Sequence, residues 1–128
     1  MKRETLSTNT RWEKLVGYSR AVKVGNTIHV AGTAATGPSG EIVGSGDSYI
    51  QTLQCIKNIR TALGRFGCTL ENVVRTRIFV VNIGDWEEVG KAHGEFFKDI
   101  KPVTTMVGVR GLIESNMLVE IEADAVID

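Results

Sequence analysis

The amino-acid sequence predicts one α+β domain in which two helices cover one face of a mixed β-sheet. A chain of 128 residues has the size of a single domain with its own core. Alternating and β-branched segments, typical of strands, are interrupted by two segments whose apolar residues recur every three or four positions. The resulting order over residues 1–128 is β-β-α-β-α-β-β. Because crossover connections are right-handed, both helices are expected on the same side of the sheet.

The first half of the chain predicts a hairpin followed by a long helix. Two strands over 18–24 and 27–34 flank a Gly-Asn pair, which is a typical two-residue hairpin turn. A glycine-rich loop over 35–47 follows. The helical spacing of apolar residues then predicts a helix over 48–66, and Gly67 ends it.

The second half of the chain predicts a strand, a helix and two further strands. The β-branched segment 72–83 is typical of a central strand. An Asp-x-x-Glu capping box opens a helix over 85–100. Strands over 103–110 and 117–127 complete the sheet. In the first of these two strands the odd-numbered residues are β-branched and suit a core, so we expect Thr104 and Met106 to lie on the opposite, open face.

The two faces of the predicted sheet differ in composition. In the central strands we expect one set of side chains to face the helices: Val74, Thr76, Ile78, Val80, Val119, Ile121, Ala123 and Ala125. The opposite face then mixes apolar and charged residues: His29, Ala31, Arg77, Phe79, Val81, Met106, Glu120 and Glu122. Such a face makes a poor solvent surface but a good subunit interface. We therefore expect a homo-oligomer that is assembled through the open face.

Charge and composition exclude several classes of function. Fifteen basic and fifteen acidic residues give a net charge of zero, and neither sign forms a run. This balance argues against a nucleic-acid partner or a membrane surface, both of which favour a basic face. No segment is apolar enough to cross a membrane, and no amino-terminal leader is evident, so we expect a cytoplasmic protein.

The cysteines and histidines do not predict a metal site. Cys55 and Cys68 lack zinc-like spacing and are expected to be free thiols in a reducing compartment. His29 and His93 belong to separate elements, with no cysteine or carboxylate at ligand spacing. His93 shares the apolar stripe of the second helix and is expected to be a packed residue. We expect no metal and no cofactor.

Five blocks of the sequence together resemble the RidA family, the YjgF-type reactive intermediate deaminases that carry the older label endoribonuclease L-PSP. The blocks are GYSRAVKVGNTIHVAGT, IQTLQCIKNIRTALGRFG, VVRTRIFVVNIGDWEEV, KPVTTM and MLVEIEADAVI. They extend from about Gly17 to Ile127 in the family's order. The resemblance implies a chorismate-mutase-like fold and a homotrimer with a small-molecule cleft between each pair of subunits.

The resemblance also implies a set of site residues. The family's water-orienting glutamate corresponds to Glu120, while Tyr18 and Gly32 match residues that line the family's cleft. Thr104 stands where deaminating members carry the arginine that binds the substrate carboxylate, and Met106 stands where they carry a cysteine. Two further departures are Gly90, in place of an asparagine, and Ala31, in place of a serine.

These departures leave two functions open. One is an enzyme that acts on enamine, imine or related carbonyl compounds, with Glu120 positioning the attacking water. The other is a binding trimer that has lost deaminase chemistry, because Thr104 cannot form a bidentate clamp on a carboxylate. Arg77 is a candidate to replace the missing arginine, although a salt bridge to Glu120 or Glu122 in the trimer interface is the favoured interpretation. Arg20 and residues 11–13 are weaker candidates at the cleft edge. Ribonuclease activity rests on the older label alone, and the neutral charge argues against it.

Overall fold

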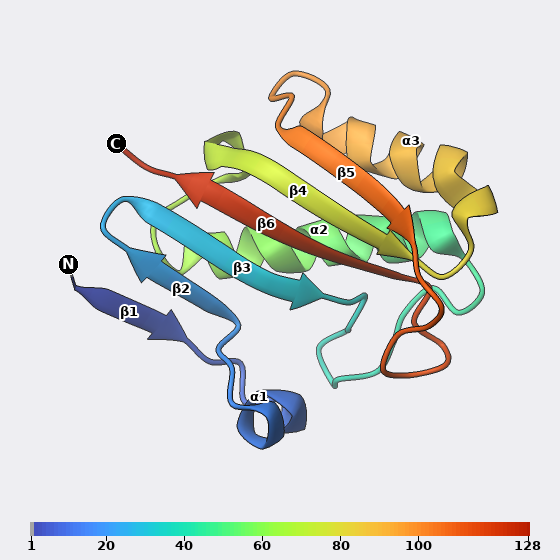
Figure 1. Cartoon of the computed structure of the whole chain (residues 1–128), viewed down its shortest axis with the longest axis horizontal. Helices are drawn as coiled ribbons and strands as arrows, with labels where there is room; N and C mark the ends of the chain where they lie inside the picture. The colour runs from blue at the N-terminus through green and yellow to red at the C-terminus, as the bar shows by residue number, and fades with distance from the viewer. Residues whose placement is uncertain (1) are drawn as a thin grey trace.

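The computed structural model describes residues 2–128 as an α+β fold built on one six-stranded sheet (Figure 1). The strands are β1 (Arg3–Leu6), β2 (Ala21–Val24), β3 (Thr27–Thr33), β4 (Val73–Val80), β5 (Val103–Gly108) and β6 (Val119–Val126). The α-helices are α1 (Arg11–Val16), α2 (Ser48–Gly64) and α3 (Trp86–Phe97), and 3₁₀ turns occupy Leu70–Asn72 and Ile83–Asp85. The predicted fold class and both long helices are confirmed.

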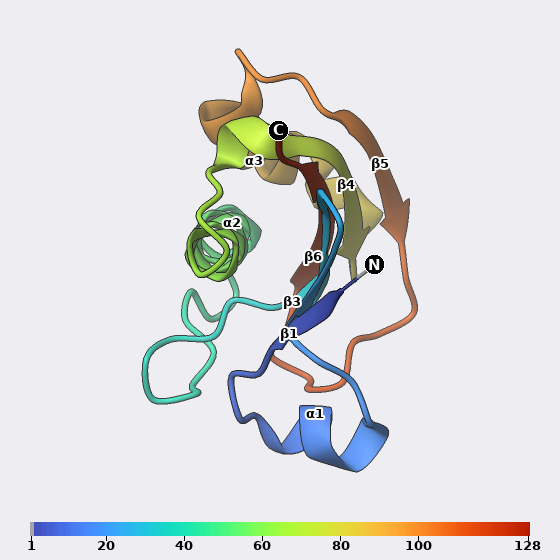
Figure 2. The ribbon, with the colours of Figure 1, turned by 90° about the vertical axis from the view of Figure 1, so that its left-hand side faces the viewer.

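The strand order is β1-β2-β3-β6-β4-β5, which places the last strand in the middle of the sheet. β4 pairs with β5 in parallel and with β6 antiparallel, so the sheet is mixed as predicted. Helices α2 and α3 both lie on one side of the sheet, and the other side carries no helix (Figure 2). The core lies between these layers, where its largest fully buried apolar side chains include Ile28, Ile56, Ile59, Leu63, Ile78 and Ile121.

The first seventeen residues contain two elements that the periodicity analysis did not predict. Strand β1 has a single buried residue, Leu6, and forms by adding to the edge of β2. Helix α1 begins with a capping box between Thr10 and Glu13 and ends at Gly17, whose φ of 87° favours glycine. An element of six residues is too short for a helical period to be visible in its sequence.

The helix-facing side of the central strands is as predicted, with one exception. The register of β4 against β6 shifts between Val73 and Arg75. This irregularity buries Val73, which is 3% exposed, and turns Val74 outward, which is 45% exposed. Val74 was expected to face the helices, and that expectation is wrong because a strict alternation cannot anticipate a shift of register.

The two faces of β5 are also the reverse of the prediction. In the parallel pairing Thr104 lies beside Thr76, and Met106 lies beside Ile78, so both side chains are on the helix-facing side. Val103 and Val107 point to the open side, where they are 57% and 41% exposed. Because β5 is an edge strand, its β-branched residues do not need a core, and the pairing with β4 decides the faces.

Both cysteines are free, as the sequence predicts, and both are buried. Cys55 lies in α2, and its thiol contacts the carbonyl of Val119 at 3.6 Å. Burial raises the pKa of Cys55 far above its ordinary value, so this thiol is not a nucleophile at neutral pH.

Candidate functional site

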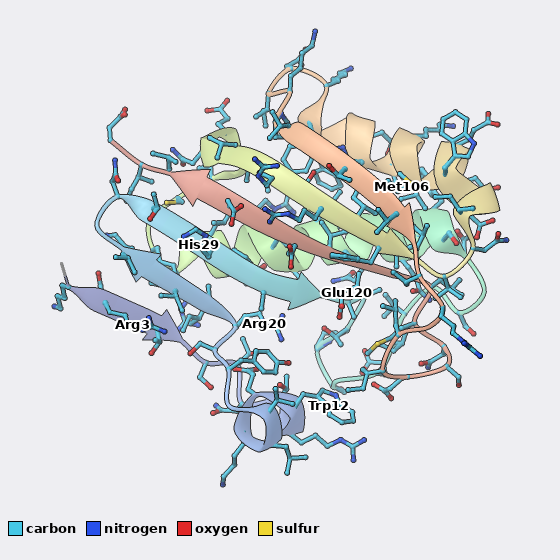
Figure 3. The ribbon with its side chains drawn as sticks, viewed as in Figure 1. Arg3, Trp12, Arg20, His29, Met106 and Glu120 are labelled. Atoms are coloured by element: carbon cyan, nitrogen blue, oxygen red, sulfur yellow. The ribbon has the colours of Figure 1, made fainter. Side chains whose placement is uncertain are left out.

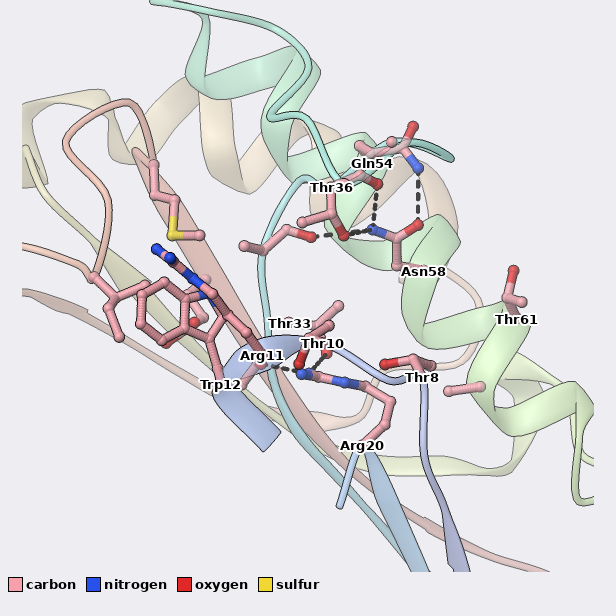
Figure 4. Close-up of a pocket in the computed structure, with 18 of the residues that line it drawn as sticks. Thr8, Thr10, Arg11, Trp12, Arg20, Thr33, Thr36, Gln54, Asn58 and Thr61 are labelled. Carbon is pink, nitrogen blue, oxygen red and sulfur yellow. Dashed lines mark hydrogen bonds between the residues drawn. The ribbon is translucent and has the colours of Figure 1, made fainter. Parts of the chain in front are cut away.

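A groove of about 900 Å³ runs between α1, the end of β3 and α2 (Figure 4). The antiparallel pairing of β3 with β6 brings the end of the first strand beside the start of the second, which places Gly32 and Glu120 in the same wall. The charged side chains that line the groove are Arg11, Arg20, Arg65, Glu114 and Glu120. Arg20 and Glu120 lie around the end of β3, and Trp12 lies below them beside α1 (Figure 3).

Glu120 lies over Gly32. A Cβ atom built on Gly32 would be 2.9 Å from both Cδ and Oε2 of Glu120 and 3.3 Å from its Cγ. Real Cβ atoms do not approach other atoms this closely, so the carboxylate position requires a glycine here. The groove wall therefore contains a carboxylate seated against bare backbone.

A guanidinium group lies beside the same glycine. Arg20 Nη1 donates to the carbonyl of Gly32 at 2.6 Å and to Thr33 Oγ1 at 3.4 Å, and Nη2 donates to Tyr18 Oη at 3.3 Å. The guanidinium carbon also lies 5.6 Å from the centre of the Tyr18 ring. Glu120, Gly32, Tyr18 and Arg20 thus form one cluster, which we call the Glu120 cluster.

The environment of Glu120 favours its neutral form more than water does. Burial raises the pKa of the Glu120 carboxyl, the nearby Arg20 charge lowers it, and Glu122 raises it further, with a net increase. Among residues 2–128, no hydrogen bond involves the Glu120 carboxyl. A half-buried carboxyl with raised pKa and free oxygen atoms is suited to bind water or a polar ligand and to exchange a proton with it.

The opposite wall of the groove is polar and firmly held. The side-chain amide nitrogen of Asn58 donates to the carbonyls of Ala34 and Thr36 at 3.1 and 2.9 Å. Its oxygen accepts a hydrogen bond from Gln54, one helical turn away, at 2.8 Å. These bonds fix the start of the glycine-rich loop against α2 and define the width of the groove.

Helix α1 closes the end of the groove and is held by Glu13. The carboxylate accepts hydrogen bonds from the hydroxyl groups of Thr8 and Thr10 at 2.6 and 2.8 Å and from the Thr8 backbone at 3.0 Å. Burial alone would raise the pKa of Glu13, but these hydrogen bonds outweigh it and lower the pKa to about 2. The helix thereby presents Trp12 and Arg11 to the groove, with the Arg11 guanidinium stacked 4.2 Å from the indole centre.

Three of the predicted site residues come together in the structure, and three do not. Tyr18, Gly32 and Glu120 belong to the Glu120 cluster. Thr104 and Met106 do not share its face: Thr104 Oγ1 lies 2.8 Å from Thr76 Oγ1, and Met106 packs against the core. The expectation that they lie on the open face is wrong, because the pairing of β5 with β4 places them beside Thr76 and Ile78, which face the helices. Whether either contacts a ligand stays a prediction.

Arg77 forms ion pairs with two carboxylates on the open face of the sheet. Its Nη1 lies 3.1 Å from Glu122 Oε1 and 3.4 Å from Asp124 Oδ2. Arg77 therefore forms an ion pair with Glu122, but the pair lies within one chain, and a salt bridge across a trimer interface stays a prediction. His29 and Arg75 join the same network through Asp124.

His93 is a packed residue, as the sequence predicts. Its ring lies 4.6 Å from the Phe97 ring, and Nε2 lies 2.9 Å from Thr76 Oγ1. Burial lowers the pKa of His93 to about 4, so the imidazole is neutral at pH 7. His93, Thr76 and Thr104 form a hydrogen-bonded chain on the helix side of the sheet.

Sequence reasoning undervalued Arg20 and missed the polar wall of α2. Tyr18 and Arg20 are two positions apart in extended chain, so alternation places both side chains on one side. Gln54 and Asn58 are four positions apart in a helix and therefore share a face. Neither pattern shows by itself that the two pairs face each other across a groove.

Across residues 2–128, no helix is long and apolar enough to span a membrane. The same residues contain no group of three histidine, cysteine or acidic side chains that could hold a metal ion.

The fold and the groove define a class, a small α+β domain with a mixed sheet and a polar groove built around a glutamate and an arginine. The family model described as endoribonuclease L-PSP matches residues 8–127. A RutC family protein from Pyrococcus abyssi is 35% identical over 98% of each chain. The human 2-iminobutanoate/2-iminopropanoate deaminase is 31% identical over 97% of this chain and 90% of its own. The crystal structure of Rv2704 from Mycobacterium tuberculosis, described as a member of the YjgF/YER057c/UK114 family, has 45% identity and a TM-score of 0.89, covering 98% of this chain and 100% of that one. The chain belongs to this family, the RidA or YjgF family.

Proposed function

We propose that the groove binds a small enamine, imine or related carbonyl compound, and that Glu120 positions the water that hydrolyses it. The observation that carries this proposal is the half-buried Glu120 carboxyl with raised pKa, seated on Gly32 without a hydrogen bond from residues 2–128. The human relative is named as a deaminase of 2-iminobutanoate and 2-iminopropanoate, which are compounds of this class.

The residues of the Glu120 cluster suit the steps of imine hydrolysis. Ionised Glu120 accepts a proton as water adds its oxygen to the imine carbon, and the C=N bond becomes a single bond. The carboxylic acid returns that proton to nitrogen, which gives a neutral carbinolamine. Ionised Glu120 then accepts the proton of the new hydroxyl group and passes it to nitrogen as the C–N bond breaks and the C=O bond forms, so the products are a carbonyl compound and ammonia. A pKa above the ordinary glutamate value brings the two forms of Glu120 closer in energy near neutral pH, which favours this exchange.

The direct test couples a lyase that generates an unstable imino acid to measurement of ammonia release, with and without this protein. Glu120→Gln keeps the size of the side chain and removes its proton exchange, so the acceleration should fall about 100-fold or more. Glu87→Gln, at an exposed position at the start of α3, is the control and should leave the rate unchanged. An equal rate in wild type and Glu120→Gln would contradict the proposal.

A second candidate is a binding trimer without deaminase chemistry. It is favoured by Thr104, which stands where deaminating members carry the substrate-binding arginine and whose hydroxyl is already bonded to Thr76. Ligand binding in a thermal-shift screen, together with no ammonia release above background, would support this candidate.

For either candidate we propose a homotrimer in the cytoplasm, with the ligand in clefts at the subunit boundaries. Support comes from the half-exposed apolar side chains of the open face, which include Val103 and Val107.

A further inference from the structure

None of the three arginines that line the groove forms an ion pair among residues 2–128, and of the three Arg20 is the one that is half-buried. The ion pairs among residues 2–128 involve Lys23, His29, Arg75 and Arg77, but not Arg20. Among residues 2–128, the hydrogen-bond acceptors of Arg20 are all neutral: the Gly32 carbonyl, the Thr33 hydroxyl and the Tyr18 hydroxyl. A half-buried guanidinium held only by neutral groups attracts an anion.

These contacts orient the Arg20 guanidinium and leave some of its N–H donors without a partner among residues 2–128. A guanidinium has five N–H donors, and three of them have partners among residues 2–128. The remaining two donors are held in a fixed plane by the bonds to Gly32 and Tyr18. A planar group that is already immobilised loses little conformational entropy when it binds a carboxylate.

The other arginines are less suitable. Arg77 is paired with Glu122 and Asp124 on the open face. Arg11 and Arg65 line the groove but are exposed, and Arg11 stacks on Trp12. Arg20 alone among these four contacts the residue on which Glu120 is seated.

We propose that Arg20 is the anion-binding residue of the groove and selects ligands whose carboxylate lies next to the group that reaches Glu120. Because Arg20 and Glu120 contact the same residue, Gly32, a ligand of a few carbon atoms is long enough to meet both. The class of ligand is a small 2-oxo, 2-imino or 2-amino acid. Arg20 thus supplies, from the β2 side of the groove, the positive charge that Thr104 lacks. This inference rests on the proposed function for the role of Glu120, but not for the anion site.

The test compares binding of 2-oxobutanoate with that of its uncharged amide, 2-oxobutanamide, by calorimetry. Wild type should bind the acid about tenfold or more tightly than the amide, and Arg20→Gln should reduce that preference to less than about twofold. Arg20→Lys should keep part of it, because the charge remains and the bidentate geometry is lost. Arg65→Gln removes the same charge from the same groove and should leave the preference unchanged.

A measurement on wild type keeps the test independent of the stability of Arg20→Gln. In a ¹⁵N spectrum, 2-oxobutanoate should shift the side-chain Nε–H signal of Arg20 and leave that of Arg65 in place. A preference for the acid that survives in Arg20→Gln, or an Arg20 signal that does not move, would overturn the proposal.

Glu120→Gln separates this inference from the proposed function. It should abolish ammonia release while keeping or strengthening the preference for the acid, because a competing negative charge is removed. Loss of turnover in Glu120→Gln with an unchanged acid preference in Arg20→Gln would reject the anion site alone. Normal turnover in Glu120→Gln with a lost preference in Arg20→Gln would reject the role of Glu120 alone.

Discussion

At the scale of single residues, the candidate site depends on the side chain that Gly32 lacks. The atoms that a Cβ at this position would meet all belong to Glu120, a flexible side chain, and none belongs to the backbone. A small substituent should therefore displace the carboxylate and leave the sheet intact. The site therefore needs two things: no side chain at Gly32 in β3, and the carboxylate of Glu120 in the neighbouring strand β6.

We predict that Gly32→Ala lowers activity more than stability. The methyl group should push Glu120 off its seat and reduce imine hydrolysis about tenfold, while the free energy of unfolding changes by less than about 1 kcal/mol. Ammonia release and urea unfolding measure the two effects. Gly64→Ala is the control, because a Cβ there meets nothing within 4 Å and a helical alanine stabilises. Full activity in Gly32→Ala would show that the Glu120 position does not matter.

At the scale of elements, α1 illustrates how a short helix is held in place. Six residues form a weak helix by themselves, and the apolar residues Leu15 and Val16 of this helix are exposed. Its stability comes from the Glu13 carboxylate, which accepts hydrogen bonds from the segment before the helix. Loss of these bonds should release the end of the groove.

We predict that the stabilisation by Glu13 depends on pH. The pKa of Glu13 is about 2 in the folded protein, against an ordinary value of 4.5, so the folded state favours the ionised form. The stabilisation is therefore complete above about pH 4.5 and is lost as the pH falls toward 2. At pH 7, Glu13→Gln should lower the free energy of unfolding by about 2–3 kcal/mol.

Urea unfolding of wild type and Glu13→Gln between pH 2 and 7 measures this difference. The gap between the two proteins should narrow below pH 4.5 and nearly close at the acid end. Glu87→Gln, an exposed glutamate at the start of α3, should change stability by less than about 0.5 kcal/mol. A gap that is constant with pH would contradict the role given to the carboxylate.

At the scale of the whole molecule, we expect the open face of the sheet to form the subunit interface. We predict a trimer of about 42 kDa by light scattering, since the chain has a mass of 14.0 kDa. Val107→Lys places a charge on the open face and should weaken the trimer. Leu15→Lys, on the outer side of α1, should leave it intact. A wild-type protein that is monomeric at micromolar concentration would rule out both the trimer and clefts at subunit boundaries.

The sequence by itself determined the elements whose periodicity is long and strong. Helices α2 and α3 and strands β3, β4 and β6 follow from apolar spacing, because burial of one face requires the same residues whatever their partners. Apolar spacing also predicted the packed state of His93. Glu120, Tyr18 and Gly32 became site candidates through the resemblance to the family, not through periodicity.

Only the tertiary structure decided which side of an edge strand faces the core and which arginine faces Glu120. The phase of β5 is fixed by its pairing with β4, and the outward turn of Val74 comes from a register shift between β4 and β6. The sequence shows Arg20 and Arg77 only as two arginines in or next to strands. In the structure Arg77 pairs with Glu122, whereas Arg20 lies beside Gly32. The local sequence shows that side chains alternate along a strand. The pairing with the neighbouring strand decides which of the two alternating sets faces the helices, and so decides which charged side chains come into contact.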